Sequence, residues 1–397
     1  MNILSFADTR FPIERANGVQ TMATCRALAA RGHRVTLLVR ADSASPPRDP
    51  FEFYGAAPLP TFTIEAVGPA SARRMQMLWT GLRRALTSRA DILYTRDLGL
   101  AALLTRVPRP GRPRLVYESH GIAPVMAAAM PALLGSPAAE PTPRKLARLD
   151  RRESVVWRQA DAYVTITQAL ADDLAMQYGT RARVFVVPDG ANPVTDGLPS
   201  RSVERSDRLA TAGVRAAYAG HLYPWKGVDV FLRALAAAPE VDGLIVGGHP
   251  GEADLARVAN LAQSLQLGDR LTITGLLPPH KVAAALAGAQ VFVLPNTATA
   301  VSERWTSPLK LFEYMARGGA IIASDLPSVR EVLTHDKTAW LVPAGDVRAL
   351  ADALSRLATD QSLRERLGNA ALALSDNFTW ERRAERLEGA FTEALTA

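Results

Sequence analysis

The sequence contains a single cysteine, Cys25, among 397 residues. One cysteine excludes an internal disulfide and any cysteine-based zinc site, and it fits a reducing compartment. No run approaches the roughly 18 consecutive apolar residues typical of a membrane-spanning helix, and the start MNILSFADTRFP lacks the charged and apolar regions of a signal peptide. We therefore expect a cytoplasmic protein.

Neither disorder nor a single small core is compatible with the composition. Hydrophobic residues make up 48% and charged residues 21% of the chain, which is ordinary for a globular protein. A chain of 397 residues also exceeds the usual size of one hydrophobic core. The composition therefore indicates two soluble domains.

Acidic residues are scarce in the first half of the chain. Residues 1–199 hold 25 Lys and Arg against 17 Asp and Glu, whereas residues 200–397 hold 21 against 22. A basic half suits phosphates or an anionic membrane, although a bias toward arginine is also compatible with a GC-rich genome. The stretch SARRMQMLWTGLRRALTSRAD places apolar residues along one helical face beside arginines, which fits either peripheral membrane contact or ordinary burial: Met75, Leu78, Leu82 and Leu86.

Short apolar runs alternate with longer helical stretches along both halves. The predicted strands are NILSFA, HRVTLLV, ADILYT, RLVYESHG, AYVTIT and ARVFVVP, then VRAAYAG, GLIVGG, RLTITG, VFVLPN, AIIAS and AWLVP. This order predicts an α/β fold of two doubly wound, Rossmann-like domains, residues 1–195 and 207–376, facing each other across a cleft. Between them, GANPVTDGLPSRSVERSDRLATAG is the expected hinge.

Several turns after predicted strands carry residues suited to ligands, because ligands of open parallel sheets collect at the carboxyl ends of the strands. Asn17 and Gly18 form a turn before a helix, His120 follows a strand, and the loop GHLYPWKG presents His221 and Lys226. Loop amides and a lysine beside a helix start can bind phosphate. Each of these features also fits a purely structural turn or a surface side chain.

In this order the motifs resemble the family 4 type (GT4-like) glycosyltransferases of the GT-B architecture. The matching pieces cover nearly the whole chain: NGVQTMATCRALAARGHRVTLLV, SHG, VVPDGANP, GHLYPWKGVDVFLRAL, LIVGG, TITGLLP, VFVLPN, LKLFEYMARGGAIIASDLPSVREVL and NFTW. The resemblance implies a hexosyltransferase that uses a nucleotide diphosphate sugar, a UDP or GDP sugar, with retention of configuration. It places the donor in the second domain and a carbohydrate, lipid-linked or small-molecule acceptor against the first, with no role for nucleic acid.

The same resemblance assigns residues to the site. Glu313 would accept hydrogen bonds from the ribose hydroxyls, although the dipole of its helix could also explain an acid there. Family members often carry a second glutamate eight residues earlier, where this chain has Trp305, and an arginine where it has His221. The expected catalytic residues are Lys226, His120, His221 and Glu303; the expected donor-binding residues are Asn17, Gly18, Gly220, Lys226, Gly248, Gly275, Ser307, Leu309, Lys310 and Glu313.

No metal or other cofactor is expected, because fixed cations and amides can stabilise the charge that grows on the leaving diphosphate. Residues 377–397 are expected to form a helix that crosses back to the first domain. Two other functions remain open: a hydrolysing sugar-nucleotide epimerase of the same fold, and a noncatalytic scaffold that binds an anionic polymer. The base, the sugar and the acceptor cannot be read from the sequence.

Overall fold

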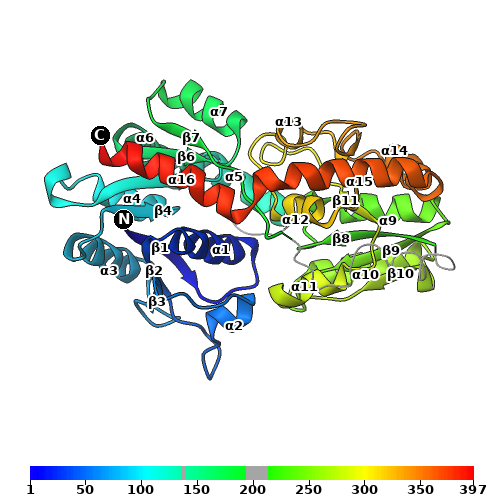
Figure 1. Cartoon of the computed structure of the whole chain (residues 1–397), viewed down its shortest axis with the longest axis horizontal. Helices are drawn as coiled ribbons and strands as arrows, with labels where there is room; N and C mark the ends of the chain where they lie inside the picture. The colour runs from blue at the N-terminus through cyan, green and yellow to red at the C-terminus, as the bar shows by residue number, and fades with distance from the viewer. Residues whose placement is uncertain (136–139, 194–212) are drawn as a thin grey trace. The chain divides into compact units, whose positions relative to one another are not determined.

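The computed structural model describes residues 1–135, 140–193 and 213–397, which form two compact units (Figure 1). Unit 1 comprises Met1–Ala128, Ala139–Asp189 and Trp380–Ala397, and unit 2 comprises Ala129–Ala138 and Gly190–Thr379. The expected domain boundaries at residues 195 and 207, and most of the expected hinge, lie outside the described residues.

Unit 1 is built on a seven-stranded sheet in the order β3-β2-β1-β4-β5-β6-β7, with every pair parallel. All six apolar runs predicted in this half form strands. The edge strand β3 was not predicted. The strands are β1 (Asn2–Arg10), β2 (Arg34–Arg40), β3 (Phe62–Ala66), β4 (Ile92–Thr95), β5 (Arg114–Ser119), β6 (Ala162–Thr165) and β7 (Val184–Val186).

Most helices of unit 1 bury apolar side chains on one face, whereas the short α2 (Pro50–Tyr54) has no buried residue. The helices are α1 (Ala16–Ala30), α2, α3 (Arg74–Thr87), α4 (Leu98–Leu104), α6 (Pro143–Gln159), α7 (Gln168–Tyr178) and α16 (Trp380–Leu395), with α5 (Ala123–Leu134) running into unit 2. None of the described helices is long and apolar enough to span a bilayer.

The last helix, α16, belongs to unit 1 and packs against α1, β5 and β6. Its Leu387 and Phe391 side chains are fully buried in the core of that unit. Phe378, just before this helix, stacks on Phe312 of unit 2 with ring centroids 5.1 Å apart. The chain thus passes from unit 2 to unit 1 after Thr379, whereas the second domain was expected to end at residue 376.

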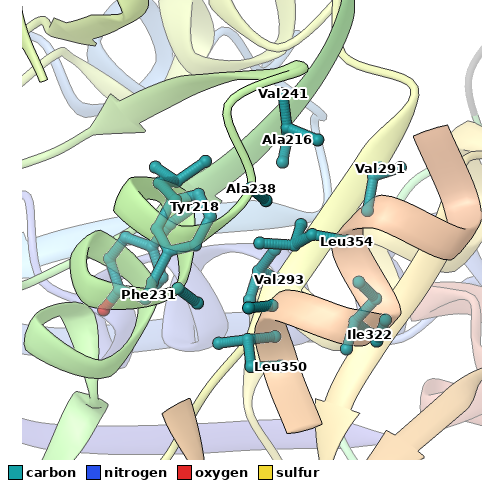
Figure 2. Packing of buried hydrophobic residues seen from close by; sticks show 14 of the residues in the cluster. Ala216, Tyr218, Phe231, Ala238, Val241, Val291, Val293, Ile322, Leu350 and Leu354 are labelled. Carbon is teal, nitrogen blue, oxygen red and sulfur yellow. The ribbon is translucent and has the colours of Figure 1, made fainter. Parts of the chain in front are cut away.

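Unit 2 contains a six-stranded parallel sheet in the order β10-β9-β8-β11-β12-β13. Its elements are β8 (Val214–Ala219), α9 (Val228–Ala237), β9 (Val241–Val246), α10 (Ala253–Ser264), β10 (Leu271–Ile273), α11 (Pro279–Ala285), β11 (Val291–Leu294), α12 (Leu309–Arg317), β12 (Ala320–Ser324), α13 (Pro327–Arg330), β13 (Trp340–Val342), α14 (Val347–Thr359) and α15 (Gln361–Ser375). Figure 2 shows part of its core, where side chains of α9 and α14 meet those of β8, β11 and β12.

Each sheet reverses its strand order at one place, between β1 and β4 in unit 1 and between β8 and β11 in unit 2. Two doubly wound sheets were predicted, and both are present. In such sheets the crevice outside the carboxyl ends of the strands at the reversal is the usual ligand site. The loops that follow β1, β4, β8 and β11 are therefore the places where functional side chains are expected.

Candidate functional site

In unit 2 the loop that follows β8 lies directly against the segment that follows β11. Gly227 has φ of 72°, and a Cβ atom there would stand only 1.7 Å from the carbonyl oxygen of Pro295, so only glycine fits. The amide of Thr297 donates to the carbonyl of Trp225 at 3.0 Å. These contacts fix the position of Lys226 at the reversal of the sheet.

The sequence left open that Lys226 is a surface side chain, and the structure places it half-buried. Its Nζ atom lies 3.5 Å from the centroid of the Trp225 ring. Burial disfavours the charged ammonium and lowers the pKa of Lys226 to about 7. A lysine held in this way gains most from an anion that restores its charge.

Lys310, in the first turn of α12, brings a second cation to the same place. Its Nζ atom is buried, has no hydrogen-bond partner within the described residues, and lies 3.7 Å from the centroid of the Tyr218 ring. It would stand 3.4 Å from a Cβ atom at Gly220, the residue that follows β8. Burial, and then the nearby charge of Lys226, hold the pKa of Lys310 well below its usual value.

Glu313 lies in the second turn of α12, because the helix begins at Leu309. The first turn contains no acidic residue, so the alternative that the helix dipole alone explains this acid is weakened, since that effect fades beyond the first turn. Burial raises the pKa of Glu313, while Arg317 and Lys310 act in the opposite direction. A half-buried carboxylate and a lysine whose Nζ atom is buried therefore share one helix.

The start of α12 presents backbone amides without a side-chain cap. Its N-cap residue is Pro308, which supplies no capping hydrogen bond, and the following amides belong to Leu309 and Lys310. Uncapped amides at a helix start suit an anion. Ser307 directly precedes this cap, and its contact with the donor remains a prediction.

The segment before α12 explains the departure at Trp305. The Trp305 side chain is buried, and its amide donates to Val301 at 2.9 Å, so this position forms part of the packing of the segment. Glu303 is only partly buried, and its carbonyl accepts from the amide of Ser328 at 2.8 Å. The backbone of Glu303 is thus fixed, while its predicted contact with the sugar remains a prediction.

His221 and the glycines expected in the donor site occupy the loops beyond β8, β9 and β10. The His221 ring stacks on Tyr223, with centroids 4.9 Å apart, and its Nδ1 atom lies 3.5 Å from the Glu252 carboxylate. Gly248 and Gly275 have φ of 105° and 71°. Another close backbone approach lies at Gly247, which the sequence did not single out: a Cβ there would stand 2.0 Å from the carbonyl oxygen of Gly220.

In unit 1 the Asn-Gly turn expected before the first long helix is absent, because α1 begins at Ala16 and includes both residues in its first turn. A Cβ at Gly18 would stand 2.5 Å from the side chains of both Ile13 and Tyr54. The Tyr54 hydroxyl donates to the carbonyl of Ile13 at 2.7 Å. Internal packing is therefore sufficient reason for a glycine here, and contact with a donor remains a prediction.

His120 belongs to a polar network at the carboxyl end of β5. Its Nε2 atom lies 2.5 Å from Oε1 of Glu118, which also accepts from Nε2 of Gln20 at 2.7 Å. Oε1 of Gln20 accepts in turn from the Arg96 guanidinium. Gln20, Arg96 and Glu118 were not predicted, although an acid within the apolar run RLVYESHG was a usable signal.

The network ends at a charged residue of α16 that the sequence also left unnoticed. The guanidinium of Arg383 donates from Nη2 to Oε2 of Glu118 at 2.6 Å, from Nη1 to the carbonyl of Val187 at 2.7 Å, and from Nε to Oγ1 of Thr24 at 3.0 Å. Arg383 and Glu118 are 0% and 1% exposed. Arg383 and Glu118 are 265 positions apart in the sequence, so local patterns could not predict the pair.

Within the described ranges, no three His, Cys, Asp or Glu side chains gather as the ligands of a metal ion would. The expectation that transfer needs no metal stays a prediction. The chemistry that unit 2 offers is electrostatic: two desolvated lysines and free helix amides for an anion, with a carboxylate one turn further along α12.

Comparison with known proteins identifies the type of each half of the chain. Residues 17–190 match the model of the glycosyl transferase 4-like domain, and residues 205–373 match that of the glycosyl transferases group 1. A D-inositol 3-phosphate glycosyltransferase of Stackebrandtia nassauensis is 28% identical over 95% of this chain and 86% of that protein. The protein of the same name from Actinosynnema mirum is 30% identical over 70% of this chain and 67% of that protein.

Solved structures match both units together. Sucrose-phosphate synthase from Thermosynechococcus elongatus matches with a TM-score of 0.76 at 20% identity. The match covers 99% of this chain and 98% of that chain. HepE of Anabaena in complex with UDP-glucose has a TM-score of 0.74 at 18% identity, with 99% of each chain covered. At these identities the likeness establishes the fold.

Proposed function

Because this chain belongs to the family 4 type glycosyltransferases and has their GT-B fold, we propose that it moves a sugar from a nucleotide diphosphate sugar to a phosphorylated polyol, retaining the anomeric configuration. The observation that carries the proposal is the cluster of Lys226, Lys310 and Glu313 at the strand reversal of unit 2. The nucleotide and the acceptor rest further on relatives: HepE was solved with UDP-glucose, and two relatives are named for D-inositol 3-phosphate.

In this proposal the diphosphate of the donor lies against the two lysines and the amides that begin α12. Lys226 and Lys310 supply the charge, and Lys310 compensates for His221, a weaker cation at neutral pH than the arginine common in the family. The Glu313 carboxylate accepts hydrogen bonds from the two ribose hydroxyls. UDP is the first candidate for the nucleotide and GDP the second.

Transfer breaks the bond between the anomeric carbon and the diphosphate oxygen and forms a bond between that carbon and the acceptor oxygen. The electron pair of the broken bond stays on the diphosphate, where Lys226 and Lys310 stabilise the growing negative charge. The acceptor attacks from the same face, and its hydroxyl proton passes to the departing phosphate oxygen. His120 and Glu303 are assigned to the sugar, and neither is a covalent nucleophile.

The proposal is tested with a panel of UDP-, GDP- and ADP-glucose and D-inositol 3-phosphate, following nucleotide release, product mass and the anomeric coupling in NMR spectra. We expect acceptor-dependent release and a product with the donor's anomeric configuration. Release without acceptor, together with an epimerised sugar, would instead indicate the epimerase. Absence of nucleotide binding in a thermal shift assay would leave the anionic-polymer scaffold.

A peripheral membrane contact is supported by one feature of α3. The predicted stripe is split: Leu78 and Leu82 are buried, while Met75 and Leu86 are exposed together with Trp79. Met75, Trp79 and Leu86 lie on one helical face, which the exposed Arg83 borders. Cosedimentation with vesicles containing anionic lipid should weaken in a Trp79→Ala variant, and binding of neutral vesicles alone would argue against this contact.

A further inference from the structure

Both carboxylate oxygens of Glu118 have hydrogen-bond partners in the His120 network. Its Oε1 atom faces Gln20 and His120, and its Oε2 atom faces the Tyr94 hydroxyl and Arg383. These partners come from α1, β4, the end of β5, and α16. A carboxylate buried to this degree keeps its charge only where a cation and further donors surround it.

The charge on Glu118 fixes the proton on His120. Burial opposes ionisation of Glu118, but Arg383 and the hydrogen bond from His120 outweigh it and hold its pKa well below the usual value. An ionised carboxylate has no proton to donate, so at 2.5 Å the shared proton belongs to Nε2 of His120. Burial and the charge of Arg96 lower the pKa of His120, so the ring is neutral near pH 7.

A neutral ring protonated at Nε2 leaves Nδ1 as a hydrogen-bond acceptor. In the described part of the chain the ring makes its polar contacts through Nε2, and its side chain is 22% exposed. An acceptor nitrogen can receive a hydrogen bond from a sugar or polyol hydroxyl, but it repels the oxygen atoms of a diphosphate. This protonation state therefore favours the sugar over the diphosphate as the partner of His120.

We propose that Arg383, acting through Glu118, is a positioning residue that keeps His120 in the Nε2-protonated tautomer and presents Nδ1 to a substrate hydroxyl. The inference rests on the proposed function for the identity of the hydroxyl, but the tautomer itself does not depend on any substrate. The structure thereby assigns a role in the site to α16, a helix whose other buried residues serve the core of unit 1.

In the described part of the chain, charged or titratable groups from several elements face His120 and Glu118, including the buried Cys25 of α1 and Tyr117 of β5. Arg96 follows β4, Asp189 follows β7, Arg383 comes from α16, and Tyr94 from β4 donates to Glu118. Asp189 lies 3.7 Å from Arg383. Burial raises the pKa of Asp189, which weakens its charge. Arg383 donates directly to Glu118, so its removal changes the charge around Glu118 most.

The tautomer is measured on the full chain labelled with ¹⁵N-histidine, using long-range ¹H–¹⁵N correlations at about pH 7, where neutral and protonated rings are distinguishable. A His120→Asn variant assigns the signal. We expect protonated Nε2 and bare Nδ1 in the wild type, and a mixture of tautomers in Glu118→Gln. In Arg383→Met the Glu118 carboxyl loses its cation and its pKa rises, so the Nε2-protonated share should increase with pH, whereas in the wild type it should not.

Kinetics provide the second readout. Glu118→Gln and Arg383→Met should lower kcat/KM by about tenfold or more, the scale of one hydrogen bond to substrate, while UDP affinity stays unchanged. Arg383→Lys keeps a cation, so it should recover part of the activity and serves if Arg383→Met folds poorly. Arg382→Met, at an exposed neighbouring position on the same helix, is the matched control and should behave as wild type.

Two results would overturn the inference. One is a wild-type His120 ring with bare Nε2. The other is a wild-type tautomer together with a wild-type kcat/KM in both Arg383→Lys and Arg383→Met. Failure of the proposed function looks different, because the wild type would then transfer no sugar to any acceptor while the NMR result on His120 stands.

Discussion

The two units treat a buried cation in different ways. In unit 1 the Arg383 guanidinium meets an ionised carboxylate, backbone carbonyls and a hydroxyl. In unit 2 the Lys310 ammonium group lies against the face of Tyr218 and has no hydrogen-bond partner among the described residues. A compensated charge supports the fold, whereas an uncompensated one costs stability that an arriving anion can return. The difference separates a residue that positions other groups from residues prepared for a ligand.

Replacing each of these two cations with methionine should give the largest difference in stability between the units. Arg383→Met leaves Glu118 buried without its counter-charge, so the free energy of unfolding should fall by about 3–5 kcal/mol. Lys310→Met removes a desolvated amine that has no partner, so it should leave stability unchanged or raise it by about 1 kcal/mol. Urea denaturation of both variants measures the pair. Equal losses in the two variants would show that Lys310 is compensated in solution.

Replacing Lys226 tests, through its effect on catalysis, whether the lysines of unit 2 bind the donor diphosphate. Lys226→Ala should lower turnover about a hundredfold or more, because the growing charge on the leaving diphosphate loses one fixed cation. The measurement is kcat with saturating donor, and circular dichroism confirms the fold. Lys281→Ala, at an exposed lysine of α11, is the control. Turnover close to wild type would remove Lys226 from the mechanism.

The carboxylate of α12 should show a smaller effect, confined to the nucleotide. Glu313→Gln keeps the shape but loses the charged acceptor, so nucleoside diphosphate binding should weaken by about 1.5–3 kcal/mol. Calorimetry with UDP and with 2′,3′-dideoxy-UDP separates the ribose contact from other effects. If both ligands lose the same affinity in the variant, Glu313 does not bind the ribose hydroxyls.

The sequence predicted the sheets better than it predicted the surroundings of charges. All twelve predicted runs form strands, because strands buried on both faces consist of continuous apolar residues that are recognisable locally. The missed strand, β3, lies at an edge, where Thr63 and Ala66 are exposed and the apolar run is interrupted. The other edge strands, β7, β10 and β13, were predicted, so the weak signal of β3 comes from its interrupted apolar run.

The candidate site was predicted where it depends on motifs and missed where it depends on distant contacts. Lys226, Lys310 and Glu313 lie within two short stretches that resemble a known family, and the structure brings both stretches to the reversal of the second sheet. Glu118 and Arg383 are separated by 264 residues in the sequence, so the residues around either one do not predict the pair. Burial of Lys226 likewise depends on Trp225 and on the fold of its loop, which the spacing of residues does not contain.

The smallest expected effect is the pH dependence of nucleotide binding, and it distinguishes the two units most finely. The pKa of Lys226 lies at about 7 without ligand, and a bound diphosphate should raise it. The protein therefore takes up a proton on binding above about pH 7, so affinity for UDP should fall with rising pH by up to about tenfold per pH unit. Stability without ligand should move the other way, because the unfolded chain holds the Lys226 proton up to about pH 10 and the folded chain releases it near 7.

Calorimetry in buffers of different ionisation enthalpy measures the proton count directly. The proton uptake should disappear in Lys226→Met and persist in Arg383→Lys, where the compensated pair of unit 1 keeps its charge throughout. An uptake that survives in Lys226→Met would move the titration to Lys310, and no uptake in the wild type would mean that the lysines of unit 2 are already charged before the nucleotide arrives.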